Sequence, residues 1–281
     1  MCRVIVPNFS LVTINILNDL SLWEQRGILM VEQLYKLNPD LIAMQEVSLI
    51  GETSNAHWLA DQLNQRHVEH EKASPYQVLL CPKTGMYAKK EGIAVLSRFQ
   101  VKNHESLDLL SQNRVAQIAR IRINDRYLLL VNGHFFWQPG VSQARQQQVE
   151  LLLDFLDTQP VDQPVIVCGD FNGMPGTPAI ERMRQYFDSA YNIANKQEPD
   201  YTCPTPLPKP KHIQLRTFIT WLLRIRPKPD PNWRGTLDYI FVDPRLQTLD
   251  SRIVLDQPAE DNIDIFPSDH FGLWATIKVT Q

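Results

Sequence analysis

Three kinds of signal are missing from this chain of 281 residues. Its four cysteines stand far apart, which excludes a Cys-x-x-Cys zinc or redox motif. No apolar run reaches the roughly 18 residues that a membrane-spanning helix needs. Pro7 and Asn8 interrupt the apolar start of the chain, and no small-residue cleavage site of a secretory signal follows. We therefore expect a cytoplasmic protein with free thiols.

An excess of positive charge is also missing. The chain has 28 Lys and Arg against 31 Asp and Glu, a net charge of −3, so no global basic field points to nucleic acid. Hydrophobic residues make up 43% and charged residues 21%, which is ordinary globular usage. We find no internal repeat, and a chain of this length can bury a sizeable core.

Strand and helix signals alternate along the chain. Ser21 and Glu24 form a capping-box pattern that predicts a helix running to Pro39, and Ser142 opens a second helix. The predicted strands cover residues 11–16, 41–47, 92–96, 115–123, 127–133, 165–170, 237–242 and 273–279. Some of these are continuous apolar runs and others form a hairpin around Asn124-Asp125, so an α/β fold with mixed sheets is favoured.

One segment departs from this pattern. Residues 204–231 hold seven of the 20 prolines, and residues 209–234 carry seven Lys or Arg against one Asp. We expect a single domain over residues 1–281 with a Pro-rich, basic and apolar insertion at about 204–234. The insertion is either a variable loop packed on the domain or a rim of the substrate cleft that contacts nucleic acid or a membrane surface. The rim candidates are Arg216, Trp221, Arg224 and Arg226.

Polar side chains gather at the ends of the predicted strands. They are Glu46, His134, Asp170, Asn172, Asp238, Asp269 and His270, and Asn15 lies inside another apolar strand. In α/β sheets, strand ends that face one crevice are where ligands bind. Carboxylate and amide oxygens suit Mg²⁺ or Mn²⁺ better than zinc. An imidazole beside a carboxylate is a positioned acid or base. Together these groups suit metal-assisted attack of water on a phosphoester. Each residue alone has an ordinary structural explanation, but the whole set does not.

The order of these motifs resembles the endonuclease/exonuclease/phosphatase superfamily of DNase I-like enzymes. The resemblance covers about residues 11–277 and rests on Asn15, Gln45-Glu46, Asn132-Gly133-His134, Gly169-Asp170-Phe171-Asn172, Leu237-Asp238-Tyr239 and Ser268-Asp269-His270-Phe271. It implies a four-layer α/β sandwich, with two mixed, mainly antiparallel sheets packed face to face and helices outside.

The resemblance also implies a role for each residue. Glu46 is the main metal ligand, with Asn15 and Asp269 close by. Asp170, with Asn172 beside it, orients or deprotonates the attacking water. Asp238 holds His270 against the scissile phosphate. His134 and Asn132 lie near that phosphate, where repair nucleases have a tyrosine in place of His134. Whether Asp170 or His270 is the general base stays open. Leu17 stands where the repair nucleases have an acidic residue, which removes one secondary metal contact.

These expectations define a phosphoester hydrolase that uses Mg²⁺ or Mn²⁺. A phosphodiester of nucleic acid is the preferred substrate. The alternatives are a phospholipid or sphingomyelin phosphodiesterase, an inositol or sugar phosphatase, and a non-catalytic binding module on the same fold. Peripheral membrane contact through residues 209–234 belongs to the lipid alternative.

Overall fold

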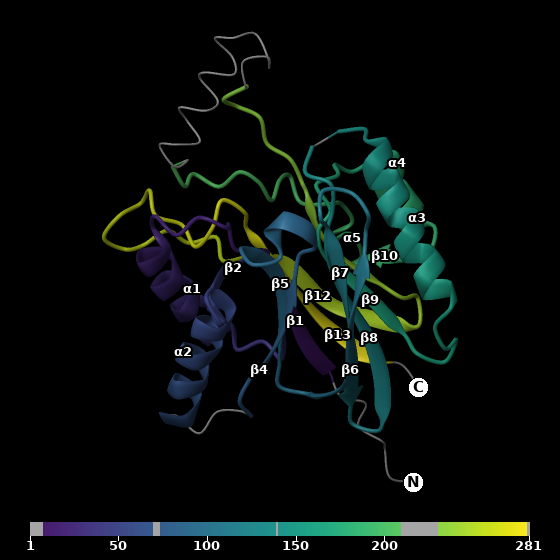
Figure 1. The fold of residues 1–281 in the computed structure, drawn as a ribbon, viewed down its shortest axis with the longest axis horizontal. Coiled ribbons are helices and arrows are strands. Elements are labelled where there is room, and N and C mark those ends of the chain that lie inside the picture. The colour runs from purple at the N-terminus through teal and green to yellow at the C-terminus, as the bar shows by residue number, and fades with distance from the viewer. Residues whose placement is uncertain (1–7, 70–73, 139, 209–229, 280–281) are drawn as a thin grey trace.

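Two β-sheets pack face to face in the structure, a computed structural model that describes residues 8–69, 74–138, 140–208 and 230–279 (Figure 1). The first sheet has the strand order β12-β13-β1-β2-β5-β4, with β3 paired to β2. Its strands are β1 (Asn8–Asn15), β2 (Leu41–Ile50), β3 (Thr53–Ser54), β4 (Gln77–Pro82), β5 (Glu91–Ser97), β12 (Leu246–Val254) and β13 (Gly272–Val279).

The second sheet has the order β10-β11-β9-β8-β7-β6. Its strands are β6 (Gln100–Asp108), β7 (Val115–Ile123), β8 (Arg126–His134), β9 (Val165–Asp170), β10 (Asp188–Ser189) and β11 (Asp238–Val242). The predicted hairpin around Asn124-Asp125 is the β7–β8 connection, and its strands are antiparallel.

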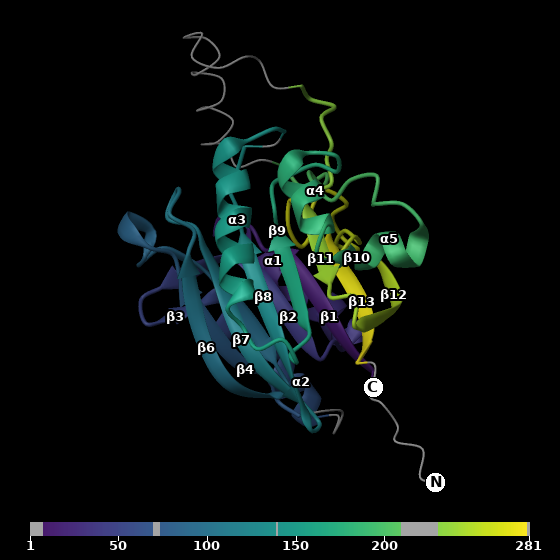
Figure 2. The same ribbon diagram turned by 90° about the vertical axis from the view of Figure 1, so that its right-hand side faces the viewer.

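Helices form the two outer layers, with α1 and α2 on one side and α3 and α4 on the other (Figures 1 and 2). They are α1 (Trp23–Leu37), α2 (Asn55–Glu69), α3 (Gln143–Asp157), α4 (Pro178–Arg184) and the short α5 (Ala190–Asn195), which packs on β12 and β11. Leu11, Leu130 and Ile166 belong to the apolar core between the sheets. Separate apolar clusters hold each pair of helices to its sheet. The predicted four-layer α/β sandwich is confirmed.

Two parallel strand pairs bring the predicted polar residues to one edge. β1 is parallel to β2, and β8 is parallel to β9, while the other pairings are antiparallel. The register places His134 beside Asp170 and Asp170 beside Asp238 on three neighbouring strands. A glycine makes this register possible, because Gly169 has φ +132° and an added Cβ would lie 2.0 Å from the Gly133 carbonyl oxygen.

Two local predictions are wrong. The helix α1 begins at Trp23 after Leu22, without a side-chain cap, because Ser21 bonds Asp19 instead of forming the capping box with Glu24. Glu46 does not end its strand either. It lies inside β2, at a register shift between Met44 and Val47, and has φ +57°. A β-bulge turns one side chain out of the alternation of a strand, which is how it re-aims a residue towards a site.

Within the described part of the chain, no helix is long and apolar enough to cross a membrane. The predicted rim residues Arg216, Trp221, Arg224 and Arg226 lie outside the described residues.

Candidate active site

Asp170, at the end of β9, is the centre of the polar cluster. Its Oδ2 accepts a hydrogen bond from Asn15 Nδ2 at 3.0 Å and lies 3.5 Å from His134 Nε2. Its Oδ1 accepts from the backbone N–H of Asn172 at 2.8 Å, a contact that the left-handed backbone of Asn172 (φ +51°) allows. The carboxylate is fully buried and therefore held in one orientation.

A histidine–carboxylate pair lies beside it. His270 Nδ1 donates to Asp238 Oδ2 at 2.9 Å, and Thr202 Oγ1 donates to the same oxygen at 2.6 Å. Thr202 Oγ1 in turn accepts from the backbone N–H of Leu237 at 3.0 Å. All of these groups are buried, so the imidazole is fixed by two hydrogen bonds in series.

Glu46 faces this cluster from the first sheet. Its Oε2 accepts from the backbone N–H of Asn18 at 3.0 Å, and its Oε1 lies 3.8 Å from His134 Nε2. Glu91, at the start of β5, lies 4.0 Å from His134 Nδ1 and forms an ion pair with Lys83. His134 therefore stands between carboxylates of both sheets.

The surroundings of these groups shift their pKa values by different amounts and in different directions. Burial, with the charge of Asp238, raises the pKa of Asp170 to about 7, against the hydrogen bonds from Asn15 and Asn172. Burial opposes a charge on His270, but the Asp238 carboxylate raises the pKa of His270 well above its usual value. Burial lowers the pKa of His134 well below the ordinary range, and the charge of Arg114 lowers it further.

The pKa values of Glu46 and Asp269 are shifted in opposite directions. Burial disfavours a charge on Glu46, but the Asn18 N–H and the charge of Arg114 outweigh it and lower the pKa of Glu46. Burial, with the nearby charge of Glu46, raises the pKa of Asp269. At neutral pH the site thus holds a charged Glu46, a charged His270 and a neutral His134.

Buried arginine and serine side chains brace the loops that carry the site. Arg26 Nη1 donates to the carbonyls of Ile16 at 2.9 Å and Pro267 at 3.0 Å. Ser268 Oγ donates to the Asn15 carbonyl at 2.6 Å. These bonds tie the end of β1 to the loop that holds Asp269 and His270.

The structure brings most of the predicted site residues together. Asn15, Glu46, His134, Asp170, Asn172, Asp238, Asp269 and His270 meet at this edge. Asn132 differs, because its side chain accepts from Gln45 Nε2 at 2.7 Å and donates to the Met44 and Ala94 carbonyls at 3.1 Å. Those bonds link the two sheets, one level below the cluster.

Some residues of the site were not predicted. Thr202, Lys83 and Arg114 have no motif around them, and the partners of Thr202 and Arg114, Asp238 and His134, lie at least 20 residues away along the chain. Glu91 is the first residue of β5, but its position opposite His134 depends on how the sheets pack.

The donor set fits a hard divalent cation. Two groups of carboxylate and imidazole atoms each lie within 4.8 Å of one another: Glu46, Glu91 and His134, and Asp170, Asp238 and His270. Oxygen donors dominate both groups, and carboxylates favour Mg²⁺ or Mn²⁺.

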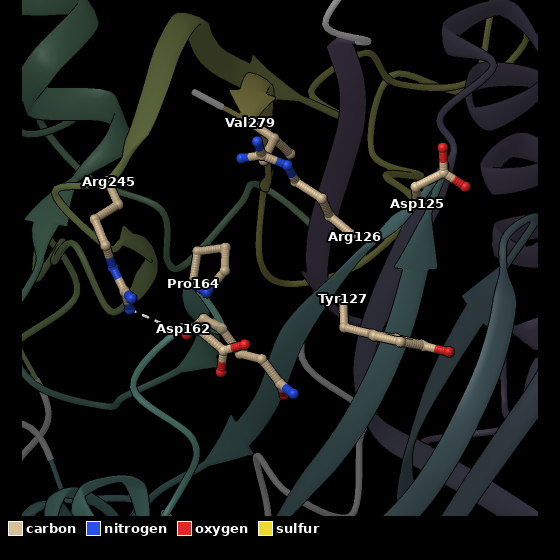
Figure 3. Close-up of a pocket in the computed structure, with 8 residues that line it drawn as sticks. Asp125, Arg126, Tyr127, Asp162, Pro164, Arg245 and Val279 are labelled. Carbon is tan, nitrogen blue, oxygen red and sulfur yellow. Dashed lines mark hydrogen bonds between the residues drawn. The ribbon is translucent and has the colours of Figure 1, made fainter. Parts of the chain in front are cut away.

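A cavity of about 440 Å³ at the opposite end of the strands lacks this chemistry (Figure 3). It lies where β8 and β9 begin and β13 ends, and Asp125, Arg126, Asp162 and Arg245 line it. Arg245 Nη2 donates to the Gln163 carbonyl at 3.0 Å. No imidazole lines this cavity, so it is not the candidate active site.

The amino-acid sequence is similar to those of several known proteins. Human Nocturnin is 26% identical over 288 residues, which cover 92% of this chain and 59% of Nocturnin. Protein angel of Drosophila melanogaster is 25% identical over 201 residues, 66% of this chain and 51% of that protein. The chain thus spans about half the length of these relatives.

Solved structures show the same fold. The catalytic domain of human Nocturnin with bound sulfate has a TM-score of 0.71 and 24% identity, covering 98% of this chain and 95% of that one. TDP2 of D. rerio, complexed with a single-strand DNA product, has a TM-score of 0.69 and 17% identity, covering 96% and 98%. The match to the family itself extends over residues 12–270, and the chain belongs to the Endonuclease/Exonuclease/phosphatase family, a family of hydrolases of phosphoester bonds.

Proposed function

We propose that this protein is a divalent-metal-dependent phosphodiesterase that hydrolyses single-stranded nucleic acid by attack of water. The observation that carries this proposal is the place of Asp170. This buried carboxyl group has a pKa of about 7 and lies between Asn15 and His134 on one side and the His270–Asp238 pair on the other. A group that is half ionised near neutral pH, beside a charged imidazole, is suited to proton transfer.

The proposed metal ligands are Glu46, Asn15 and Asp269, with Mg²⁺ or Mn²⁺ as the ion. The lowered pKa of Glu46 supports this assignment, because a ligand must be ionised to bind a cation. A bound divalent cation supplies charge neutralisation at the phosphoryl oxygens.

The protein side chains take the remaining roles. Asp170 orients the attacking water and accepts its proton. The charged His270, held by Asp238, donates to a phosphoryl oxygen as negative charge develops there. The neutral His134 and the amide of Asn172 contact the same phosphate. Both pKa values are raised, so His270 keeps its proton at neutral pH while Asp170, with a pKa of about 7, can lose its own and accept one from water; this favours Asp170 as the general base.

Two similarities support nucleic acid as the substrate class. One structural neighbour is named as holding a single-strand DNA product, and Ccr4 of Kluyveromyces lactis, 22% identical over 92% of this chain and 38% of its own length, is named as a 3′-5′-exoribonuclease. The net charge of −3 disfavours long duplex DNA, whose binding depends on many phosphate contacts.

The test is hydrolysis of a substrate panel with Mg²⁺, with Mn²⁺ or with EDTA. The panel holds single-stranded RNA and DNA, duplex DNA, sphingomyelin, other phospholipids and inositol phosphates. We expect metal-dependent turnover of the single strands, lost in Glu46→Ala and His270→Ala, with unchanged circular dichroism.

Other outcomes assign other functions. Turnover of lipid alone, with liposome binding that disappears when residues 209–234 are excised, identifies a phospholipase-type enzyme. Turnover of inositol phosphates alone identifies a phosphomonoesterase. A folded protein that turns over no substrate, and whose ligand affinity survives in both alanine variants, is a binding module.

A further inference from the structure

A second pocket adjoins the candidate active site. Its volume is about 430 Å³, and it is lined by Lys83, Tyr87, Glu91, Arg114, Trp137 and two neighbouring amide side chains. None of the residues proposed for water attack lines it. Arg114 forms the shared wall, because its Nη1 lies 2.6 Å from both ring nitrogens of His134.

Arg114 is a buried cation without a carboxylate partner. Arg114 is only 7% exposed. Among the described residues, no carboxylate lies within ion-pair distance of its guanidinium group. Its side-chain hydrogen-bond partner is the imidazole of His134 rather than a carboxylate, and its Nε is buried without a partner in the described structure. An uncompensated buried charge is costly for a fold, and such charges are normally paired.

The neighbouring cation increases this excess. Lys83, also 7% exposed, is paired with Glu91, so the one carboxylate that lines this pocket is already in an ion pair with the other cation. Burial lowers the pKa of Lys83, and the nearby positive charge of Arg114 lowers it further, against the carboxylates of Glu91 and Glu46. An anion between the two cations would offset their like charges.

The pocket is pre-formed rather than loose. Three non-glycine residues of the Arg114 loop, Leu110, Gln112 and Asn113, have φ between +56° and +61°. Strained backbone of this kind persists only where the surroundings enforce it. Gln148 of α3 supplies part of that restraint, because it accepts from the Phe136 N–H at 2.7 Å and donates to the Ser111 carbonyl at 3.1 Å. It thus fixes the loops of Arg114 and Trp137 to each other.

Two aromatic rings stand among the lining residues. Trp137 is 41% exposed and Tyr87 is 43% exposed, and Lys83 Nζ lies 5.8 Å from the Tyr87 ring centroid. Cations beside accessible rings are the arrangement that binds a phosphate together with its base.

We propose that this pocket binds a second, non-scissile phosphate of the substrate, with Arg114 as the specificity-determining residue and Trp137 as the surface on which the adjoining base stacks. The inference rests on the proposed function and sharpens its substrate class to nucleotides that carry a phosphate next to the scissile one. His134 links the two phosphate sites, because it contacts both Arg114 and Asp170.

The first test measures binding, so that it does not depend on turnover. Isothermal titration in EDTA compares adenosine 3′,5′-bisphosphate with 5′-AMP and 3′-AMP. We expect the bisphosphate to bind at least tenfold more tightly than either monophosphate. That preference should fall to within about twofold in Arg114→Gln and survive in part in Arg114→Lys. Arg245→Gln, the same exchange at the opposite cavity, is the matched control and should keep the full preference.

The second test measures turnover of three dinucleotides that share one scissile bond: TpT, pTpT and TpTp. The wild type should prefer one of the phosphorylated forms at least tenfold in kcat/KM, and Arg114→Gln should bring that ratio close to one. Equal affinity of the wild type for the bisphosphate and both monophosphates overturns the proposal. A binding preference without any hydrolysis keeps the pocket and refutes the phosphodiesterase, whereas hydrolysis without a preference does the reverse.

Discussion

The two ends of strands β8 and β9 carry polar groups that differ in burial and in charge pairing. β8 runs from Arg126 to His134, and β9 ends at Asp170. At the far end, Arg245 is half-exposed, is paired with Asp243 and bonds the Val161 and Gln163 carbonyls. At the site end, Asp170 and His134 are buried together, and Arg114 has no carboxylate partner among the described residues.

The pKa shifts express this difference. Burial disfavours the charge on Asp243, but hydrogen bonds from Arg245 outweigh it and lower the pKa of Asp243. The pKa of Asp170 is raised to about 7, because burial and Asp238 outweigh its donors. Ionised Asp243 therefore stabilises the fold, whereas ionised Asp170 destabilises it. The far end is arranged for stability, and the site end keeps charges that folding alone does not favour.

The largest expected effect is a loss of catalytic activity that substitutions at the site end cause and substitutions at the far end do not. Glu46→Gln, Asp170→Asn and His270→Gln should each lower kcat/KM on a single-stranded oligonucleotide by about 10²–10⁴-fold, because each removes a ligand, base or charged donor. Asp243→Asn and Arg245→Gln should stay within about twofold of the wild type. A site-end variant that keeps more than a tenth of wild-type activity contradicts the assignment of that residue.

The second prediction concerns stability. In EDTA at pH 8, Asp170→Asn should raise the free energy of unfolding by about 1–3 kcal/mol, because it removes a buried charge. The folded-state pKa of Asp170 lies above its unfolded value of 3.8. Its stabilising contribution is therefore complete below pH ~4 and is lost as pH rises through about 7. The advantage of the variant should disappear near pH 4.

Asp243→Asn is the matched control for this measurement. Its pKa is lowered in the folded state, so its contribution is present above the unfolded pKa and is lost as pH falls through the folded one. Urea unfolding at several pH values should therefore show a loss of stability for this variant at pH 8. The same sign for both variants would refute the proposed difference between the ends.

Thr202→Val tests the hydrogen bond that holds Asp238. The valine leaves Asp238 Oδ2 with only His270 as donor and leaves the Leu237 N–H unpaired. We expect kcat to fall about tenfold with KM nearly constant, and stability to fall by about 1–2 kcal/mol. Thr202→Ser restores the hydroxyl and should recover most of both. Equal losses in the serine variant would point to packing rather than to the hydrogen bond.

The smallest effect is expected at the far end. Arg245→Ala removes an ion pair and two bonds to carbonyls, but the side chain is half-exposed and its charge is screened. We expect a loss of about 0.5–1 kcal/mol in the free energy of unfolding, reduced at 0.5 M NaCl, and no change in kcat/KM. A salt-independent loss would assign the effect to the carbonyl bonds instead.

Residue patterns predicted the elements of the fold better than their local details. Continuous apolar runs marked strands such as β1, β5 and β9, because these are buried on both faces in a four-layer sandwich. They did not reveal the bulge at Glu46, since a bulge depends on the pairing partner of a strand. The capping box failed for a related reason: Asp19 competes for the Ser21 hydroxyl.

The site followed the same rule. Residues at strand ends, such as His134 and Asp170, were predictable because the ends of parallel strands share an edge. Arg114 was not, because a charged residue before a strand is ordinarily exposed, and only the packing of two loops buries this one. The role of Thr202 depends on Asp238, 36 residues further along the chain.

The backbone bridge next to Thr202 makes this fold a candidate for circular permutation. Cys203 and Gly235 exchange backbone hydrogen bonds of 3.1 and 2.8 Å, so the two ends of the segment between them lie side by side. The entropy cost of closing a loop rises by only about 0.6 kcal/mol for each doubling of its length. Folding therefore places little constraint on how many residues lie between them. New chain termini placed there, with the old ones joined, should give a circular permutant that still assembles both sheets.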